Sequence, residues 1–573
     1  MKNALFLILC SFTVSLAQDA DLERFCDSLM PNATRSDMPA SLLIVAKDGK
    51  PLVRKAYGMA NLEMGVPAST EHCFTLASVN KQMLAICILQ LANNGKLKME
   101  DDIRKYLPDF ESHGRVITVE QLLNHTSGIF SANSPARGKS FYDHTSDFGL
   151  LSDKQFIEYA GQAQLLFEPG TDWSWNTFGF YLTLFVIEKA SGMPFNDYVR
   201  KHLFEPAGME NSISKVDGNR LGLNGIKKLN TSFYFPDADG KWVWRDTRMF
   251  TPYFFYQRYA IVTSLDDLVK WDEALRNGKL LPLNLVEKAW TAGHLKDGRT
   301  TNYGLGWVVS EYNGYKILSH IGIGSNPIVT MHVPQERLYI VCTQFFGNIE
   351  QVELRVKKIL SRLLPLPYPK ATKAYAPLSE YSGVYQVHRN GLDIVPQISD
   401  IPVYMNVTVR NDTLFVRQTA SPEITLRPAG RDKFLPANSE NVFYEFFRDD
   451  KGNVNAVATR GTFWPYGPEV RNLRVEKTLP PPASALYPTV KAVKKYIGVY
   501  YHPPFDSYIF IETDGTKLYN RIQGRLQELI PVADNKFVRK GIGDVWLEFK
   551  STPNGAMSLT VSGLRSLDYK KLD

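Results

Sequence analysis

The sequence predicts an α/β multidomain protein: an antiparallel sheet flanked by helices, with a helical lobe, followed by two small all-β barrel or sandwich domains. Short alternating strand patterns open and close the first part of the chain around a long, mainly helical stretch. A strand-rich pattern then occurs twice. With 44% apolar residues in a chain of 573, the composition is sufficient for packed cores.

The first domain begins with two strand patterns, Ser41–Ala46 and Leu52–Ala56, joined at the turn signal Asp48-Gly49. It closes with a helical pattern at Glu350–Leu364, preceded by four more strand patterns at Trp307–Val309, Tyr315–Ser319, Ile328–Val333 and Leu338–Gln344. We expect the first and last strands to share one antiparallel sheet, with a cleft between the sheet and the helical lobe.

Two proline-rich segments, Leu364–Pro369 and Leu479–Pro482, indicate semi-rigid linkers because proline blocks helix and ladder pairing. They predict a large N-terminal domain at residues 22–364 and two β modules at residues 378–477 and 489–573.

The two β modules repeat each other. Tyr381–Tyr385 recurs as Tyr496–Tyr500, and Asp432–Phe434 recurs as Asn535–Phe537. Short alternating runs separated by Asn-Asp, Asp-Gly and Asn-Gly signals predict antiparallel barrels or sandwiches that pack on or flank the first domain.

The N-terminus has the pattern of a secretory signal peptide. Lys2 precedes an apolar run at Ala4–Val14, and small residues lead to Ala17. We expect residues 1–17 to be removed and the protein to be secreted, into a periplasm or the extracellular space. No later stretch approaches about 18 apolar residues, so no membrane span is expected.

The charge balance and the cysteine positions exclude several classes of partner and ligand. Lysine and arginine number 66 against 59 acidic residues, with no run of five like charges, so no nucleic-acid partner is expected. The cysteines are too scattered for a disulfide framework or for metal-ligand spacing. We expect neither a metal nor a cofactor.

The sharpest local feature is Ser78-Val79-Asn80-Lys81, which opens an apolar run ending in a glycine cap. Lys81 falls one turn after Ser78 on the same helix face. Burial would lower the pKa of Lys81 and let it accept the serine proton, while the helix N-terminus would favour the oxyanion. The alternative is a capping serine with a surface lysine, and a second Ser-x-x-Lys begins at Ser212.

Five motifs in order make the chain resemble the serine β-lactamase and penicillin-binding-protein superfamily, in its class C β-lactamase, D-alanyl-D-alanine carboxypeptidase and esterase branch. The resemblance spans roughly residues 22–364, and the tail resembles the lipocalin-like modules of some members. The motifs are Ala77–Gln82, Leu122–Ile129, Phe204–Met209, Tyr303–Trp307 and His320–Gly322.

The resemblance implies acyl transfer through a serine ester. Ser78 would be the nucleophile and Lys81 its proton acceptor, while His320 would help to hold the substrate or the proton network. The backbone N–H groups of Ser78 and of Ile323, directly after Gly322, would form the oxyanion hole. His125, within its motif, is expected to fix a turn rather than to catalyse.

One motif departs from the family. Where relatives have Tyr-x-Asn, an ungapped register places Trp175 and Thr177, and an indole N–H cannot relay protons as a phenol can. A register shifted by one residue offers Ser174 and Asn176 instead, as the Ser-x-Asn form of other branches. Both registers remain open from the sequence.

Two functions follow. The first is a secreted serine hydrolase that cleaves an amide or ester in a small peptide, ester or β-lactam-like substrate. The alternative is a catalytically impaired relative that serves as a binding or extracellular matrix protein. Intact Ser78, Lys81 and His320 favour the enzyme, whereas Trp175 and Thr177 favour the alternative.

Overall fold

The computed structural model forms two compact units, one holding the described residues between 20 and 364 and the other those between 374 and 572. The predicted signal peptide and the segments Pro365–Pro369 and Leu479–Pro482 lie outside the described residues. The described residues are 20–33, 35, 37–130, 152–162, 164–214, 233–236, 241–245, 260–312, 314–323, 326–347, 349–364, 374–387, 403–418, 423–436, 442–461, 472–475, 494–502, 507–513, 517–522, 525–533, 535–539, 542–551, 557–562 and 566–572.

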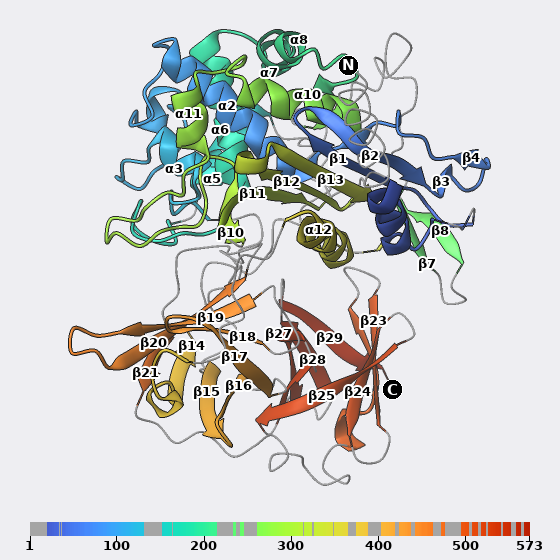
Figure 1. Ribbon diagram of the computed structural model, residues 1–573, viewed down its shortest axis with the longest axis vertical. Coiled ribbons are helices and arrows are strands. Elements are labelled where there is room, and N and C mark those ends of the chain that lie inside the picture. Colours follow the sequence, from blue (N-terminus) through green and yellow to red (C-terminus); the bar gives the residue numbers. More distant parts are fainter. Residues whose placement is uncertain are drawn as a thin grey trace, which may run out of the picture. The chain divides into compact units, whose positions relative to one another are not determined.

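A six-stranded antiparallel sheet lies at the centre of the first unit (Figure 1), in the order β10-β11-β12-β13-β1-β2. The first strands therefore pair with the last, as predicted, with Ser41 opposite Gln344 and Lys47 opposite Leu338. The strands are β1 (Ser41–Lys47), β2 (Lys50–Tyr57), β10 (Val308–Tyr312), β11 (Tyr315–Gly322), β12 (Ile328–Val333) and β13 (Leu338–Gln344).

Helices cover both faces of this sheet. Six of the seven residues of β1 are buried, so its side chains pack above and below the sheet. One face meets α12 (Ile349–Leu363) and the helix at residues 20–29 in a single apolar cluster. The other face lies under α10 (Leu265–Arg276), which contacts β1 and β13 (Figure 1).

The helical lobe is built around α2, which contacts α6 and is buried from Asn80 to Leu91 because its sequence is apolar nearly all round. Helix α2 spans Asn80–Asn93. The other α-helices of the lobe are α3 (Val119–Leu123), α5 (Asp153–Gly161), α6 (Thr177–Ser191), α7 (Phe195–Val199), α8 (Glu205–Ala207) and α11 (Leu283–Ala289). Short strands pair as β3 (Met59–Asn61) with β4 (Val66–Pro67), β5 (Phe74–Thr75) and β6 (Ile213–Ser214) with β9 (Ile261–Thr263), and β7 (Phe233–Pro236) with β8 (Trp242–Arg245).

The second unit consists of two closed eight-stranded barrels, so of the two predicted forms the barrel is the correct one. Each interior is filled by aliphatic and aromatic side chains of the described strands. The strands of the first are β14 (Gly383–Val387), β15 (Val403–Arg410), β16 (Thr413–Gln418), β17 (Ile424–Gly430), β18 (Lys433–Pro436), β19 (Val442–Arg448), β20 (Val454–Gly461) and β21 (Asn472–Val475). Those of the second are β22 (Gly498–His502), β23 (Ser507–Thr513), β24 (Leu518–Ile522), β25 (Arg525–Ala533), β26 (Lys536–Arg539), β27 (Ile542–Ser551), β28 (Met557–Ser562) and β29 (Ser566–Leu572).

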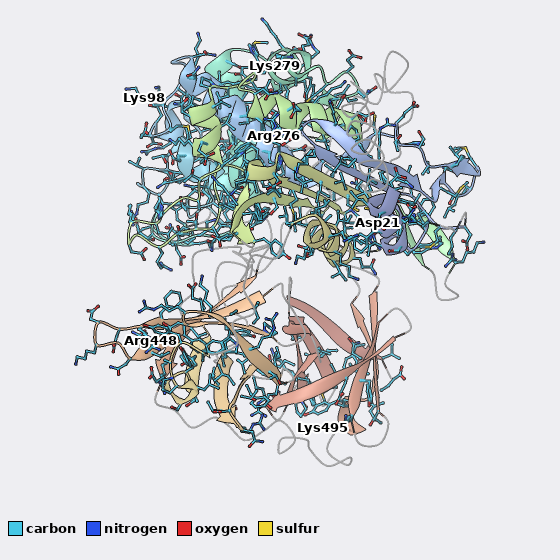
Figure 2. All side chains as sticks on the ribbon, in the orientation of Figure 1. Asp21, Lys98, Arg276, Lys279, Arg448 and Lys495 are labelled. Atoms are coloured by element: carbon cyan, nitrogen blue, oxygen red, sulfur yellow. The ribbon has the colours of Figure 1, made fainter. Side chains whose placement is uncertain are left out.

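The repeated sequence occupies equivalent places in the two barrels. The Tyr385 hydroxyl donates to the carbonyl of Tyr381 at 2.7 Å, and the Tyr500 hydroxyl donates to that of Tyr496 at 2.8 Å. One ion pair of the first barrel has no equivalent in the second: Arg448 (Figure 2) pairs with Asp432 at 2.9 Å, and the repeat has Asn535 in place of Asp432.

Candidate active site

Ser78 lies in the 3-10 turn η1 (Ala77–Val79) that leads directly into α2. The preceding residue, Ala77, has a φ of +46°, a left-handed conformation that is unusual for a residue with a side chain. Ser78 is half-buried, whereas the helix after it is buried. The strained turn therefore leaves the serine at the positive end of a long helix.

Lys81 is the immediate partner of this serine. Its Nζ lies 3.0 Å from Ser78 Oγ, and the residue is 1% exposed. The ammonium faces the rings of Trp175 at 4.9 Å and Phe180 at 5.4 Å. Burial lowers the pKa of Lys81 to about 7, so a large fraction of the amine is neutral at neutral pH and able to accept a proton.

The segment before α6 brings Trp175, rather than Asn176, to the lysine. The Asn176 side chain accepts the N–H of Gly179 at 3.0 Å and donates to the carbonyl of Ile129, so it caps α6. Thr177 begins that helix, and the backbone N–H of Ser174 donates to the carbonyl of His125 at 3.0 Å. The geometry thus corresponds to the ungapped register.

His320 lies on β11 and is fully buried. Its Nδ1 is 2.7 Å from the carbonyl oxygen of Ile321, and its Nε2 is 3.1 Å from the hydroxyl of Tyr303. Burial, and secondarily the nearby Lys81, lower the pKa of the imidazole to about 3. Both ring nitrogens are engaged within the protein, whereas the sequence led us to expect His320 on the substrate or in the proton network.

The end of β11 runs close to the nucleophile. A Cβ at Gly322 would lie 2.6 Å from the carbonyl oxygen of Leu76 and 3.1 Å from the Cβ of Ala77, so only glycine fits there. Ile323, the next residue, is 66% exposed. The two predicted oxyanion N–H groups, of Ser78 and Ile323, thus belong to segments that meet at this glycine.

Sequence reasoning assigned no role to Tyr303, although it lies within one of the five motifs. The expectation for His125 fits its geometry, because its Nδ1 accepts the backbone N–H of Asn176 at 3.0 Å and its φ is +64°. Its ring contacts those of Trp175 at 4.5 Å and Tyr303 at 4.7 Å. Burial holds the pKa of His125 well below its ordinary value, so the ring stays neutral.

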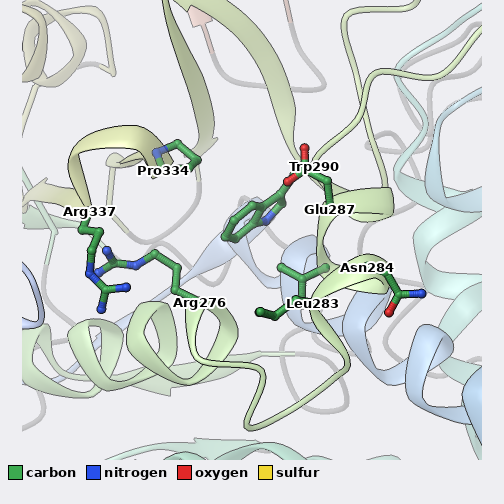
Figure 3. A pocket seen from close by; sticks show the side chains of 8 residues that line it. Arg276, Leu283, Asn284, Glu287, Trp290, Pro334 and Arg337 are labelled. Carbon is green, nitrogen blue, oxygen red and sulfur yellow. The ribbon is translucent and has the colours of Figure 1, made fainter.

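The second Ser-x-x-Lys does not resemble the first. Ser212 is 8% exposed, and its hydroxyl donates to the carboxylate of Asp267 at 2.8 Å. A separate hollow of about 420 Å³ lies beside α10 and α11 (Figure 3). None of the predicted site residues lines it; its lining is Arg276, Leu283, Asn284, Val286, Glu287, Trp290, Pro334 and Arg337.

In the described part of the chain, no three His, Cys, Asp or Glu side chains gather as a metal ion would require. The same residues include no helix that is both long enough and apolar enough to cross a bilayer.

The sheet, the helical lobe and the serine–lysine pair at a helix N-terminus are the features of a serine hydrolase. The sequence model of the beta-lactamase family matches residues 27–353, and the chain belongs to this family. The match does not reach either barrel, so the lipocalin-like character of the barrels stays a prediction.

Relatives with different activities resemble this chain. A penicillin-binding protein of Bacillus subtilis (strain 168) is 26% identical over 69% of this chain and 87% of its own length. The D-aminopeptidase of Gluconobacter oxydans (strain 621H) is 24% identical over 62% of this chain, which spans 64% of the enzyme. The octameric penicillin-binding protein homologue from Pyrococcus abyssi shares the fold, with a TM-score of 0.50 and 20% identity over 79% of this chain and 99% of that one.

Proposed function

We propose that this protein is a secreted serine hydrolase that cleaves an amide or ester bond through an acyl-enzyme on Ser78. The observation that carries the proposal is the 3.0 Å contact between Ser78 Oγ and the buried Nζ of Lys81. Two relatives, the D-aminopeptidase and an esterase from Burkholderia gladioli, are named for cleavage of these two bond types.

Acylation follows from this geometry. Neutral Lys81 takes the proton of Ser78 Oγ as the oxygen attacks the carbonyl carbon, and the backbone N–H groups of Ser78 and Ile323 stabilise the oxyanion. The Lys81 ammonium then gives the proton to the leaving amine or alcohol. Water attacks the ester in the second half, with Lys81 again as base and Ser78 as leaving group.

The surroundings of the serine favour an uncharged acyl group. Its partner Lys81 lies over the indole of Trp175, and the neutral rings of His125 and His320 lie against that indole. Among these described groups, Lys81 is the one cation that a substrate carboxylate would meet, and that lysine must be neutral to act. We therefore expect simple esters, amides and β-lactams without a required carboxylate at this position.

An activity-based probe tests the proposal. A fluorophosphonate or a labelled penicillin should attach to the purified protein, with the adduct located on Ser78 by peptide mass spectrometry. Ser78→Ala should abolish labelling, and Ser212→Ala, the matched serine of the second motif, should leave it intact. Adduct on another residue, or undiminished labelling of Ser78→Ala, would contradict the assignment.

The second candidate is a catalytically impaired binding or extracellular matrix protein. The position of Trp175 favours it, since an indole lies against Lys81 where relatives carry a phenol. Absence of adduct from the folded wild-type protein, at probe concentrations that label a related hydrolase, would support this candidate over the enzyme.

A further inference from the structure

Tyr303 and His320 form a buried pair next to the nucleophile. Tyr303 is 1% exposed and His320 is fully buried, with the hydroxyl and Nε2 separated by 3.1 Å. The same imidazole reaches the carbonyl of Ile321 through Nδ1 at 2.7 Å. Neither nitrogen is therefore left for a substrate.

The directions of these hydrogen bonds follow from the groups involved. A carbonyl oxygen only accepts, so the proton of the neutral imidazole is on Nδ1 and is donated to Ile321. Nε2 then carries the lone pair and accepts the phenol O–H of Tyr303. The tyrosine thus fixes both the tautomer and the orientation of the ring.

The contacts continue from the imidazole to the serine. His320 holds the carbonyl of Ile321, and the next residue, Gly322, lies against Leu76 and Ala77, one residue before Ser78. Any shift of Ile321 would also move Gly322, which is packed so closely against Leu76 and Ala77 that not even a Cβ would fit between them. It would also move the N–H of Ile323.

The loop that carries Tyr303 is itself fixed to the base. Gly306, with a φ of +88°, lies so close to α2 that a Cβ there would be 2.7 Å from the carbonyl oxygen of Lys81. The N–H of Gly304 donates to the carbonyl of Trp307 at 2.8 Å, which closes the turn. One loop therefore sets the position of Lys81 and, through His320, that of the β11 end.

We infer that Tyr303 is a positioning residue, which acts through His320 to hold the Ile321–Ile323 end of β11 where its N–H meets the oxyanion. The inference rests on the proposed function and deepens it. His320 serves as a neutral strut, by which we mean an uncharged imidazole that links the Tyr303 hydroxyl to the carbonyl of Ile321 and takes no part in proton transfer. Lys81 alone carries the proton between Ser78 and the leaving group.

The groups that face the imidazole are consistent with a neutral strut. A charge on Lys81 lies close enough to oppose protonation, the neutral ring of His125 lies nearby, Trp175 packs at 5.5 Å between ring centres, and Tyr303 donates to the imidazole. Protonation of Nε2 would displace the phenol proton from its acceptor.

Histidine ¹⁵N NMR of the resting protein tests the strut without any need for catalysis. The His320 signals, assigned by comparison with His320→Asn, should show the Nδ1–H tautomer and no titration between about pH 5.5 and 8.5. An Nε2–H tautomer or a titration near the ordinary histidine pKa would overturn the inference.

Kinetics test the consequence. Tyr303→Phe should slow probe acylation about tenfold to a hundredfold while leaving the midpoint of the pH profile unchanged. The matched control is Tyr312→Phe, which also removes a buried hydroxyl, here one 3.0 Å from Ser361 Oγ on α12, and it should acylate at the wild-type rate. Equal rates for the two variants would overturn the inference.

A double-mutant cycle separates positioning through His320 from a direct role. Tyr303→Phe added to His320→Ala should cost nothing further, because the strut is already absent. Full additivity would contradict the inference. If the probe does not label the wild-type protein but His320 shows the expected NMR spectrum, the proposed function is wrong and the hydrogen-bonded arrangement of His320 still stands.

Discussion

At the scale of single residues, the site depends on the burial of one amine. Lys81 has no carboxylate among the contacts described around its Nζ, which are a hydroxyl and two aromatic rings. An ammonium gains little from such neighbours compared with water, so burial alone shifts the equilibrium to the free amine. The burial of Lys81 therefore has two effects: it makes the amine a base for catalysis, and it lowers the free energy of unfolding.

The pH dependence of acylation should follow this lysine. Its folded pKa of about 7 means that the base is lost as pH falls through 7, and the rate of probe attachment should drop about tenfold per pH unit below that value. Above pH 8 the rate should be level. Stopped-flow or gel-based labelling across this range measures it, and a rate still rising toward pH 10 would show that the amine is not desolvated.

Lys81→Met serves as the control for that measurement. It should abolish labelling at every pH, because no base remains. It should also raise the melting temperature at neutral pH, since above pH 7 the unfolded chain binds a proton on this amine that the folded chain does not.

At the scale of elements, the sequence predicted the pairing of first and last strands because turn signals and alternation are local properties. It also predicted Ser78 at the start of a helix. It left the register before α6 open, although Asn176 followed by a helix is the pattern of an N-cap. The strut role of His320 was out of reach, because it depends on the loop at Tyr303, and no local pattern relates that loop to β11.

The position of Trp175 gives a prediction for this segment. Trp175→Tyr combined with Thr177→Asn should place a phenol against Lys81 and raise turnover of simple esters or β-lactams at least about tenfold, because a positioned acid–base group contributes about a hundredfold or more. Steady-state hydrolysis rates measure the gain.

Ser174→Ala is the matched control, since only the backbone of Ser174 is seen in contact with His125. It should retain wild-type turnover. A crippled Ser174→Ala together with an unimproved double variant would restore the shifted register.

At the scale of the whole molecule, the described residues form separate apolar clusters in the two units: one at the sheet and a small one at Trp173, Tyr303 and Val308 in the first unit, and one in each barrel. Every residue proposed for the site belongs to the first unit. A substitution in a barrel core should therefore lower the stability of that barrel without changing the acylation of Ser78.

Arg448→Met tests this separation. It leaves Asp432, 8% exposed, without its cationic partner and should destabilise the first barrel by about 2–4 kcal/mol, seen as an earlier calorimetric transition. The control is Ser551→Met, at the equivalent end of β27, which should shift nothing. Labelling of Ser78 should be unchanged in both, and its loss in Arg448→Met would show that the two units depend on each other.

Barrel closure also bears on aggregation. β14 pairs with β21, and β22 pairs with β29, so each barrel closes and none of its described strands is left as an unpaired edge. The six-stranded sheet has two edges, at β10 and at β2, and the β2 edge carries Pro51 and the cations Lys50, Arg54 and Lys55. Proline and charge are the features by which natural edge strands resist intermolecular pairing, so the β2 edge is protected against fibril-like self-association.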